Sequence, residues 1–224
     1  DGVITAVDFK GRTIWTKETG AVEGASEYGS GSSPALYKDR VIIVNDNRKQ
    51  SYIAAYELRT GRELWNVPRQ ESQSWATPLV WENELRTEIV TASTNKVRSY
   101  DLDGGLLWEL KGMTNLSTPS PFANQGLVYI SSGYPGTSPR PVYAIKPGAA
   151  GDISLVKDQT SNEFVVWYQP LLGTYNTSAL VLGNYYYTLL DRGFLLCHDA
   201  KTGKEIYGRQ RISAESSGFT ASPW

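Results

Sequence analysis

The sequence predicts an all-β protein built from repeated four-stranded antiparallel sheets, and three observations support this fold class. An eleven-residue pattern recurs along the chain, clearest at 55–65 and 197–207. A serine or threonine before proline recurs every 43 or 44 residues, with one longer interval. No apolar stripe at helical spacing competes with these signals. Two markers that share one period indicate a repeat architecture.

The recurring pattern joins a small residue, a polar or acidic residue, a tight turn and a large aromatic residue. Two further copies begin at Ala6 and Ser99, and a fourth begins at Ala144 but reaches Trp167 only after a long insertion. Glycine adopts the left-handed conformation of such hairpin turns without steric cost. We therefore expect the turn glycines to close the hairpins at Gly11, Gly61, Gly104 and Gly203.

The second marker opens each repeat with a small hydroxyl residue. It is found at Ser33-Pro34, Thr77-Pro78, Ser120-Pro121 and Ser222-Pro223, with Ser178-Ala179 as a variant. The interval from Pro121 to Ala179 is 58 residues, so one repeat carries an insertion of about 14 residues.

Each repeat is predicted to contain four short strands. In the second repeat they lie at 34–37, 41–44, 52–56 and from 63, and the run 41–44 has the β-branched composition of a buried strand. In the fifth repeat they lie at 180–182, 185–190, 194–198 and 205–207. Four strands per repeat of this length indicate a β-propeller, in which blades stack face to face.

The aromatic residues that open the fourth strands are expected to pack between neighbouring blades, facing the small residues of the pattern. They are Trp15, Trp65, Trp108, Trp167 and Tyr207.

The chain is predicted to form a single propeller segment, 1–224, with about five blades' worth of sequence. The expected divisions are a partial blade at 3–20, complete blades at about 32–70, 76–112, 119–170 and 177–212, and the start of another blade at 217–224. An open arc would expose sheet edges. We therefore expect part of a larger ring; the alternative is a closed five-bladed ring with a three-stranded seam.

Composition narrows the function. The 22 Lys and Arg residues balance 23 Asp and Glu residues, which gives no support for nucleic-acid binding. No apolar run is long enough to span a membrane, and the first residues do not read as a signal peptide. The single cysteine, Cys197, is expected to be a buried structural thiol.

No catalytic or metal-binding constellation is visible in the sequence. Cys197 and His198 are neighbours on a strand, so their side chains should point to opposite faces. The acidic residues of the pattern occupy equivalent positions in different blades and cannot converge on one ion. We expect each to bond its own hairpin turn; they are Asp8, Glu57, Asp101 and Asp199.

The pattern at 55–65, Ala-x-acid-x-x-Thr-Gly-x-x-x-Trp, resembles the tryptophan-docking motif of the pyrroloquinoline-quinone (PQQ) type propeller repeat, as do the Ser-Pro openings. The resemblance covers residues 3–223. Such repeats occur in quinoprotein dehydrogenases, in the BamB-type lipoprotein of outer-membrane protein assembly and in sensor domains. The resemblance implies an extracytoplasmic location, periplasmic or secreted.

The function expected from this resemblance is a non-catalytic scaffold that binds a protein or a small ligand and needs no cofactor. One alternative is a fragment of a quinoprotein dehydrogenase that uses PQQ and calcium, although the adjacent cysteine pair of the alcohol dehydrogenases is absent here. Another is a carbohydrate-binding or sensor propeller.

The expected binding face lies at the end of the blades where the loops between second and third strands meet the segments between blades. The long loop 131–141 should project there and carries Tyr134 and Arg140, residue types enriched at interfaces. The segments between blades add Tyr28, Trp75 and Tyr175, with Phe219. The insertion 149–162, which follows the departures Lys146 and Pro147-Gly148, is expected to be a solvated extension at the opposite end.

Overall fold

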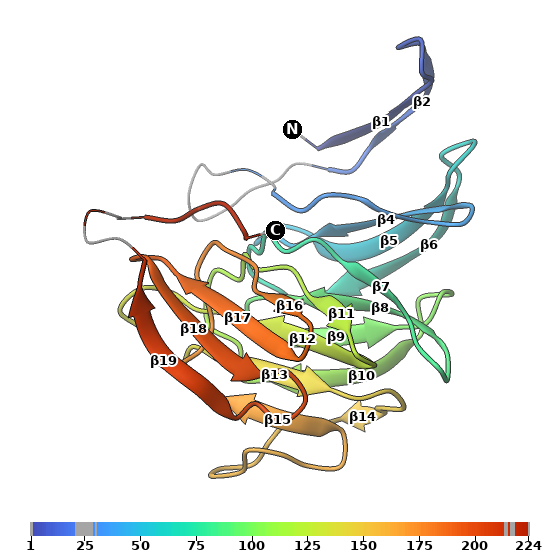
Figure 1. Ribbon diagram of the computed structural model, residues 1–224. Helices are drawn as coiled ribbons and strands as arrows, with labels where there is room; N and C mark the ends of the chain where they lie inside the picture. Colours follow the sequence, from blue (N-terminus) through green and yellow to red (C-terminus); the bar gives the residue numbers. More distant parts are fainter. Residues whose placement is uncertain (1, 21–28, 30, 213–214, 216–217, 224) are drawn as a thin grey trace.

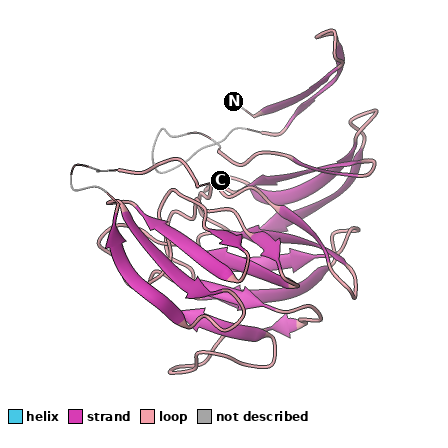
Figure 2. Cartoon of the chain, in the orientation of Figure 1, coloured by secondary structure: helices cyan, strands magenta, loops and turns pink. Residues whose placement is uncertain are grey.

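The computed structural model describes residues 2–20, 29, 31–212, 215 and 218–223. Over these residues it contains strands, turns and loops and no helix (Figure 2). None of the described segments is therefore a helix that could cross a membrane. The predicted all-β class is confirmed.

The strands form one two-stranded hairpin and four larger sheets (Figure 1). The hairpin pairs β1 (Val3–Val7) with β2 (Thr13–Glu18). The first large sheet contains β3 (Ala35–Tyr37), β4 (Arg40–Asn45), β5 (Ser51–Glu57) and β6 (Glu63–Arg69). The second contains β7 (Leu79–Glu82), β8 (Thr87–Ala92), β9 (Lys96–Tyr100) and β10 (Leu106–Lys111).

The third large sheet contains β11 (Phe122–Asn124), β12 (Leu127–Ser131), β13 (Val142–Ile145) and β15 (Val165–Gln169). The fourth contains β16 (Leu180–Leu182), β17 (Tyr185–Leu190), β18 (Phe194–Asp199) and β19 (Glu205–Arg211). Within each sheet, these consecutive strands pair in antiparallel order. The strands predicted for the second and fifth repeats are confirmed, and their bounds shift by a few residues.

The core lies between consecutive sheets, which follow one another side by side in Figure 1. One apolar cluster joins the second sheet to the third through residues such as Trp108, Val128 and Val165. Another joins the third to the fourth through Trp167, Tyr129 and Tyr186. Each sheet is hydrophobic on both faces, so it is stable only when it packs against its neighbours.

A row of hydrogen bonds links the hydroxyl residues that open the repeats. The backbone N–H of Ser33 donates to Oγ1 of Thr77 at 3.0 Å, and the N–H of Thr77 donates to Oγ of Ser120 at 2.9 Å. Ser120 and Ser178 continue the row in the same way, at 3.2 and 2.8 Å, and it ends at the hydroxyl of Ser222. The repeat marker thus ties each sheet to the next.

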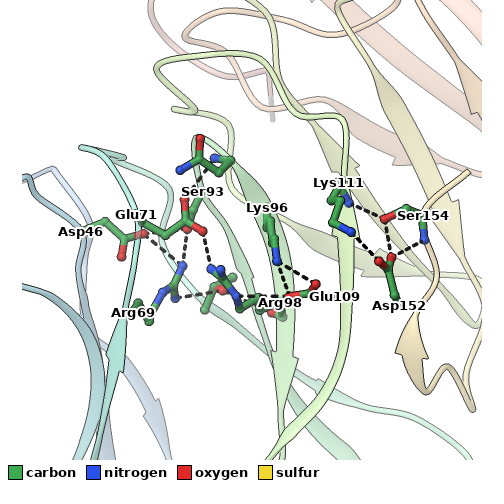
Figure 3. Close-up of polar contacts among 12 residues, drawn as sticks. Asp46, Arg69, Glu71, Ser93, Lys96, Arg98, Glu109, Lys111, Asp152 and Ser154 are labelled. Atoms are coloured by element: carbon green, nitrogen blue, oxygen red, sulfur yellow. Dashed lines mark hydrogen bonds and ion pairs between the residues drawn. The ribbon is translucent and has the colours of Figure 1, made fainter.

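The insertion at 149–162 corrects the expectation of a solvated extension. Residues Gly151–Asp152 form β14, which pairs with β10 of the preceding sheet in parallel orientation. Ile153 is buried in the core beside Trp108. Lys111 binds Asp152 at 2.6 Å, as Figure 3 shows. Removing the apolar side chain of Ile153 from water is favourable. This burial explains why the insertion, although mostly polar, folds back over β10 as a strap.

Candidate binding site

Three tryptophans dock on the turn of the following sheet. A Cβ added at Gly61 would lie 2.7 Å from Cδ2 of Trp15, and the equivalent distance from Gly203 to Trp167 is 2.6 Å. Gly104 and Trp65 repeat this contact at 3.0 Å. Since these glycines have positive φ and touch the indole face, the turns need glycine both for backbone conformation and for space.

The same three rings also donate a hydrogen bond to the turn that they contact. The indole Nε1 of Trp15 donates to the carbonyl of Leu58 at 2.9 Å, and that of Trp65 donates to the carbonyl of Leu102 at 2.8 Å. Trp167 donates to the carbonyl of Ala200 at 2.8 Å. Each ring therefore satisfies its one donor while its apolar surface is covered.

Trp108 departs from this arrangement because the next turn is replaced by the insertion. Its ring is fully buried, and its Nε1 donates to Oε2 of Glu88 at 2.7 Å. Glu88, itself 0 % exposed, also accepts from Arg86 at 2.9 Å. Arg86 in turn donates to the carbonyl of Ala149 in the insertion at 2.6 Å. At this junction, hydrogen bonds through the side chains of Glu88 and Arg86 therefore replace the direct bond from the indole to the turn.

Two of the predicted aromatic and turn-glycine positions remain, Gly11 and Tyr207, and they lie at the two outer faces of the described sheets. A Cβ at Gly11 would meet no atom within 4 Å. Tyr207 is half-buried on β19, opposite Cys197. Among the described residues, these two positions have no ring-on-glycine contact.

The acidic residues of the pattern bond their own turns, as the sequence predicts. Oδ1 of Asp101 accepts the N–H groups of Asp103 and Gly105, both at 2.8 Å. The backbone N–H of Arg12 and the side-chain hydroxyl of Thr202 make the leading bonds that hold the pKa values of Asp8 and Asp199 below their usual range. In the part of the chain that the structure describes, no three His, Cys, Asp or Glu side chains could hold a metal ion.

Cys197 and His198 are both buried on β18, and their side chains point to opposite faces of the sheet. Burial raises the pKa of the Cys197 thiol and lowers that of the His198 imidazole. Both shifts favour the neutral side chains.

A cleft of about 530 Å³ lies at the end of the sheets where second and third strands are joined, which we call the loop end. Three such loops and two segments between sheets contribute to this loop cleft. Its lining residues are Arg48, Ser72, Gln73, Thr94, Asn115, Leu116, Tyr134 and Thr137. Within the described part of the chain, hydroxyl, amide and apolar groups surround a single positive charge, and no carboxylate lines the cleft.

The residues predicted for a binding face are distributed around this end. Tyr134 lines the loop cleft and packs edge-on against Tyr175, with ring centroids 5.1 Å apart. Trp75 is half-buried, and its indole N–H donates to the carbonyl of Gly29 at 3.2 Å, so it supports the segment between sheets. Arg140 lines a second cleft on the other side of its loop. Tyr28 lies outside the described residues.

Buried ion pairs hold the walls of the loop cleft. Asp46, at the start of the loop that carries Arg48, binds Arg69 at 3.1 Å, and both side chains are almost completely buried (Figure 3). Oδ2 of Asp46 also accepts from Ser74 at 2.8 Å and from Ser93 at 2.6 Å. One carboxylate therefore fixes two loops and a segment between sheets.

A second group of charges secures the neighbouring wall. Arg98 binds Glu71, and Glu71 accepts the backbone N–H of Asn95 at 3.0 Å (Figure 3). Arg98 also lies 3.8 Å from Glu109, which binds Lys96 at 2.7 Å. The segment around Gln73 and the loop of Thr94 are consequently held together before any partner arrives.

Several residues of the loop cleft were not identified from the sequence. Gln73, Thr94 and Asn115 are polar residues in short connections, and their only sequence signal is that each follows a strand at the loop end. Leu116 adopts a left-handed conformation with φ of 60°. A non-glycine residue in this region carries backbone strain, which is found more often at binding sites than elsewhere.

Comparison with known proteins identifies the type of fold. A sequence profile described as outer membrane protein assembly factor BamB matches residues 1–208. The structure is similar to BamB from Moraxella catarrhalis, with a TM-score of 0.66 and 19% identity over 98% of this chain and 60% of that chain. It is also similar to the computationally designed Ika8 protein, with a TM-score of 0.60 and 15% identity over 99% and 59% of the two chains.

No curated protein sequence matches the chain. The chain spans about 60% of the length of the solved BamB chain. At these identities the structural likeness establishes the fold alone, a β-propeller of the PQQ-like type, which confirms the resemblance stated from the repeats.

Proposed function

Because the chain belongs to the family of outer membrane protein assembly factor BamB, we propose that it is a non-catalytic propeller scaffold whose loop cleft binds a segment of a partner protein. The single observation that carries this proposal is the loop cleft itself. Its polar lining comes from five separate connections, and buried ion pairs fix three of them in advance, namely the loops of Arg48 and Thr94 and the segment of Gln73. Preorganisation lowers the entropic cost of binding.

The lining suits an extended peptide segment. Asn115 supplies an exposed amide, and the side-chain oxygens of Gln73 and Thr137 can accept backbone N–H groups, while Nε2 of Gln73 donates to the carbonyl of Gly29 and Oγ1 of Thr137 to that of Tyr134. Tyr134 offers an exposed ring at one wall, and aromatic residues of this kind anchor many protein interfaces. We propose that these four residues make the main contacts.

The wider setting forms part of the same proposal. The family description supports an extracytoplasmic location for the protein, either periplasmic or secreted. It also supports an association with outer membrane protein assembly. Each four-stranded sheet is proposed to be one blade, within the blade bounds predicted from the sequence. The repeated docking of tryptophan on glycine and the 60% coverage of the BamB chain support a ring larger than these sheets.

The proposal is tested by site-specific photo-crosslinking. A photoreactive residue at Thr137, in the loop cleft, is expected to give one discrete protein adduct in an extract of the source cells. The same residue at Thr202, on an exposed glycine turn, is the matched control and should give none. Mass spectrometry identifies the adduct, and the purified partner is then titrated against the chain.

The Tyr134→Ala variant should weaken that titration at least about tenfold, since a central aromatic anchor is lost. Equal adducts at Thr137 and Thr202, or unchanged affinity of Tyr134→Ala, would contradict the proposal.

A further inference from the structure

A second cleft at the loop end differs from the first in its charge. It has a volume of about 370 Å³ and lies between the loop of Tyr134, the turn that joins β17 to β18, and strand β19. We call it the arginine cleft. Its lining residues are Pro135, Gly136, Arg140, Leu190, Asp191, Arg192, Phe194 and Arg209.

Three arginines and one carboxylate line this cleft, and the carboxylate is already occupied. Asp191 binds Arg140 at 2.8 Å, and its other oxygen accepts the backbone N–H of Tyr175 at 3.2 Å. Among the described residues, neither Arg192 nor Arg209 takes part in an ion pair, and Arg140–Asp191 is the one pair in the cleft. A net positive charge is therefore concentrated here, although the whole chain carries a formal charge of −1.

The floor of the arginine cleft is apolar and orients the cations. Arg209 lies over the ring of Phe194 with its guanidinium 5.9 Å from the centroid, and Arg211 lies over the same ring at 5.1 Å. Leu190 and Pro135 complete the apolar surface. Stacking on an aromatic ring leaves the edge of a guanidinium able to donate two parallel hydrogen bonds to a carboxylate.

Arg140 is held rigidly and fixes the shape of the wall. Its backbone N–H donates to the carbonyl of Pro170 at 2.7 Å, and its own carbonyl accepts the N–H of Gly173 at 2.8 Å. Its side chain bridges two sheets through Asp191. The wall is thus built before a ligand binds, and a preformed cationic cleft also accelerates the approach of an anionic partner.

We propose that the arginine cleft binds an acidic segment of the partner protein, with carboxylates on Arg192 and Arg209 and an apolar side chain against Phe194. A peptide fits better than nucleic acid because the positive charge is local and the floor is apolar. The inference rests on the proposed function and adds the chemistry of the partner.

The test uses the full chain and two fluorescein-labelled octapeptides, one of alternating Glu and Phe and one of alternating Gln and Phe. Fluorescence anisotropy should show at least about tenfold tighter binding of the Glu peptide, because only its carboxylates pair with guanidinium groups. Raising the salt from about 50 to about 300 mM should weaken this preference, since the interaction is exposed to screening.

The variant Arg192→Glu/Arg209→Glu should lose at least about tenfold in affinity for the Glu peptide. The matched control is Lys201→Glu/Lys204→Glu, which makes the same change of net charge on an exposed turn of the same sheet and should stay within about twofold. The Arg192→Gln/Arg209→Gln variant removes the two positive charges without adding negative ones, so it is less prone to a folding defect. Thermal unfolding of every variant checks that each one folds.

Three outcomes would overturn the inference: equal binding of the two peptides, equal loss in both double Glu variants, or displacement of the Glu peptide by inorganic phosphate at a concentration as low as that of the peptide itself. The last outcome would identify an anion site instead of a peptide site. Because this assay uses synthetic peptides, its failure leaves the crosslinking result at Thr137 unaffected, and the two proposals fail separately.

Discussion

Two junctions between sheets solve the same packing problem in different ways. Between the first and second large sheets, Trp65 lies on Gly104 and bonds the carbonyl of Leu102 directly. Between the second and third, Trp108 has no such turn to meet, and Glu88 with Arg86 carries the connection to the insertion. The ring position is kept although its hydrogen-bond acceptor has changed.

The difference shows that the aromatic residue and the glycine turn are separable parts of the repeat. The regular junction needs a short turn with glycine at positive φ. The irregular junction replaces it with the buried carboxylate of Glu88, which is stabilised by its hydrogen-bond donors. These donors are Trp108, Ser99, Arg86 and Asn83. The strap β14 then covers the edge strand β10 of the second sheet.

The largest effect is expected from Trp108→Ala. The ring is completely buried, and its loss also removes a donor to Glu88, so we expect about 3–5 kcal/mol less free energy of unfolding. The matched variant Trp65→Ala, at a half-buried ring, should cost about 2 kcal/mol. Urea unfolding followed by circular dichroism measures both. A larger cost for Trp65→Ala would show that the regular junction is the stronger one.

An intermediate effect is expected from Gly203→Ala, with Gly11→Ala as its control. Both glycines have positive φ, so both variants should lose about 1 kcal/mol through backbone strain. At Gly203 the new methyl group also meets Trp167, which should add about 1–3 kcal/mol, whereas at Gly11 it meets nothing. Equal losses in thermal unfolding would mean that the ring and turn are not packed as closely as described.

The smallest effect is expected from Asp152→Asn, which breaks the exposed tie between β14 and β10. The hydrogen bond from Lys111 holds the pKa of Asp152 well below its ordinary value of 3.8. A lowered folded-state pKa stabilises the fold above 3.8, and this contribution disappears as the pH falls through the folded-state pKa.

Because both side chains are about half exposed, the loss at neutral pH should stay below about 1 kcal/mol and shrink in high salt. Denaturant titrations of the wild type and the variant at neutral and at acidic pH measure it. A difference that is the same at both pH values would rule out the ion pair as its cause.

Much of the fold could be predicted from particular residues. Gly61 and Trp65 mark a turn and a strand start because glycine conformation and ring size act locally. The loop of Tyr134 could be placed at the loop end because antiparallel connections alternate between the two ends of the sheets. Glu88 was not singled out, although a carboxylate within the apolar strand 87–92 is a signal that buried donors must surround it.

By itself, the sequence determined the period of the repeats, the strands and the turns, because these depend on residues close together in the chain. The tertiary structure alone decided which carbonyl each indole meets, that the hydroxyl markers bond one another, and that the insertion straps a neighbouring sheet. It also decided the charge of the two clefts, since their lining residues come from separate sheets. These indole, hydroxyl and insertion contacts join residues more than thirty positions apart, as between Ser33 and Thr77, and no local pattern specifies them.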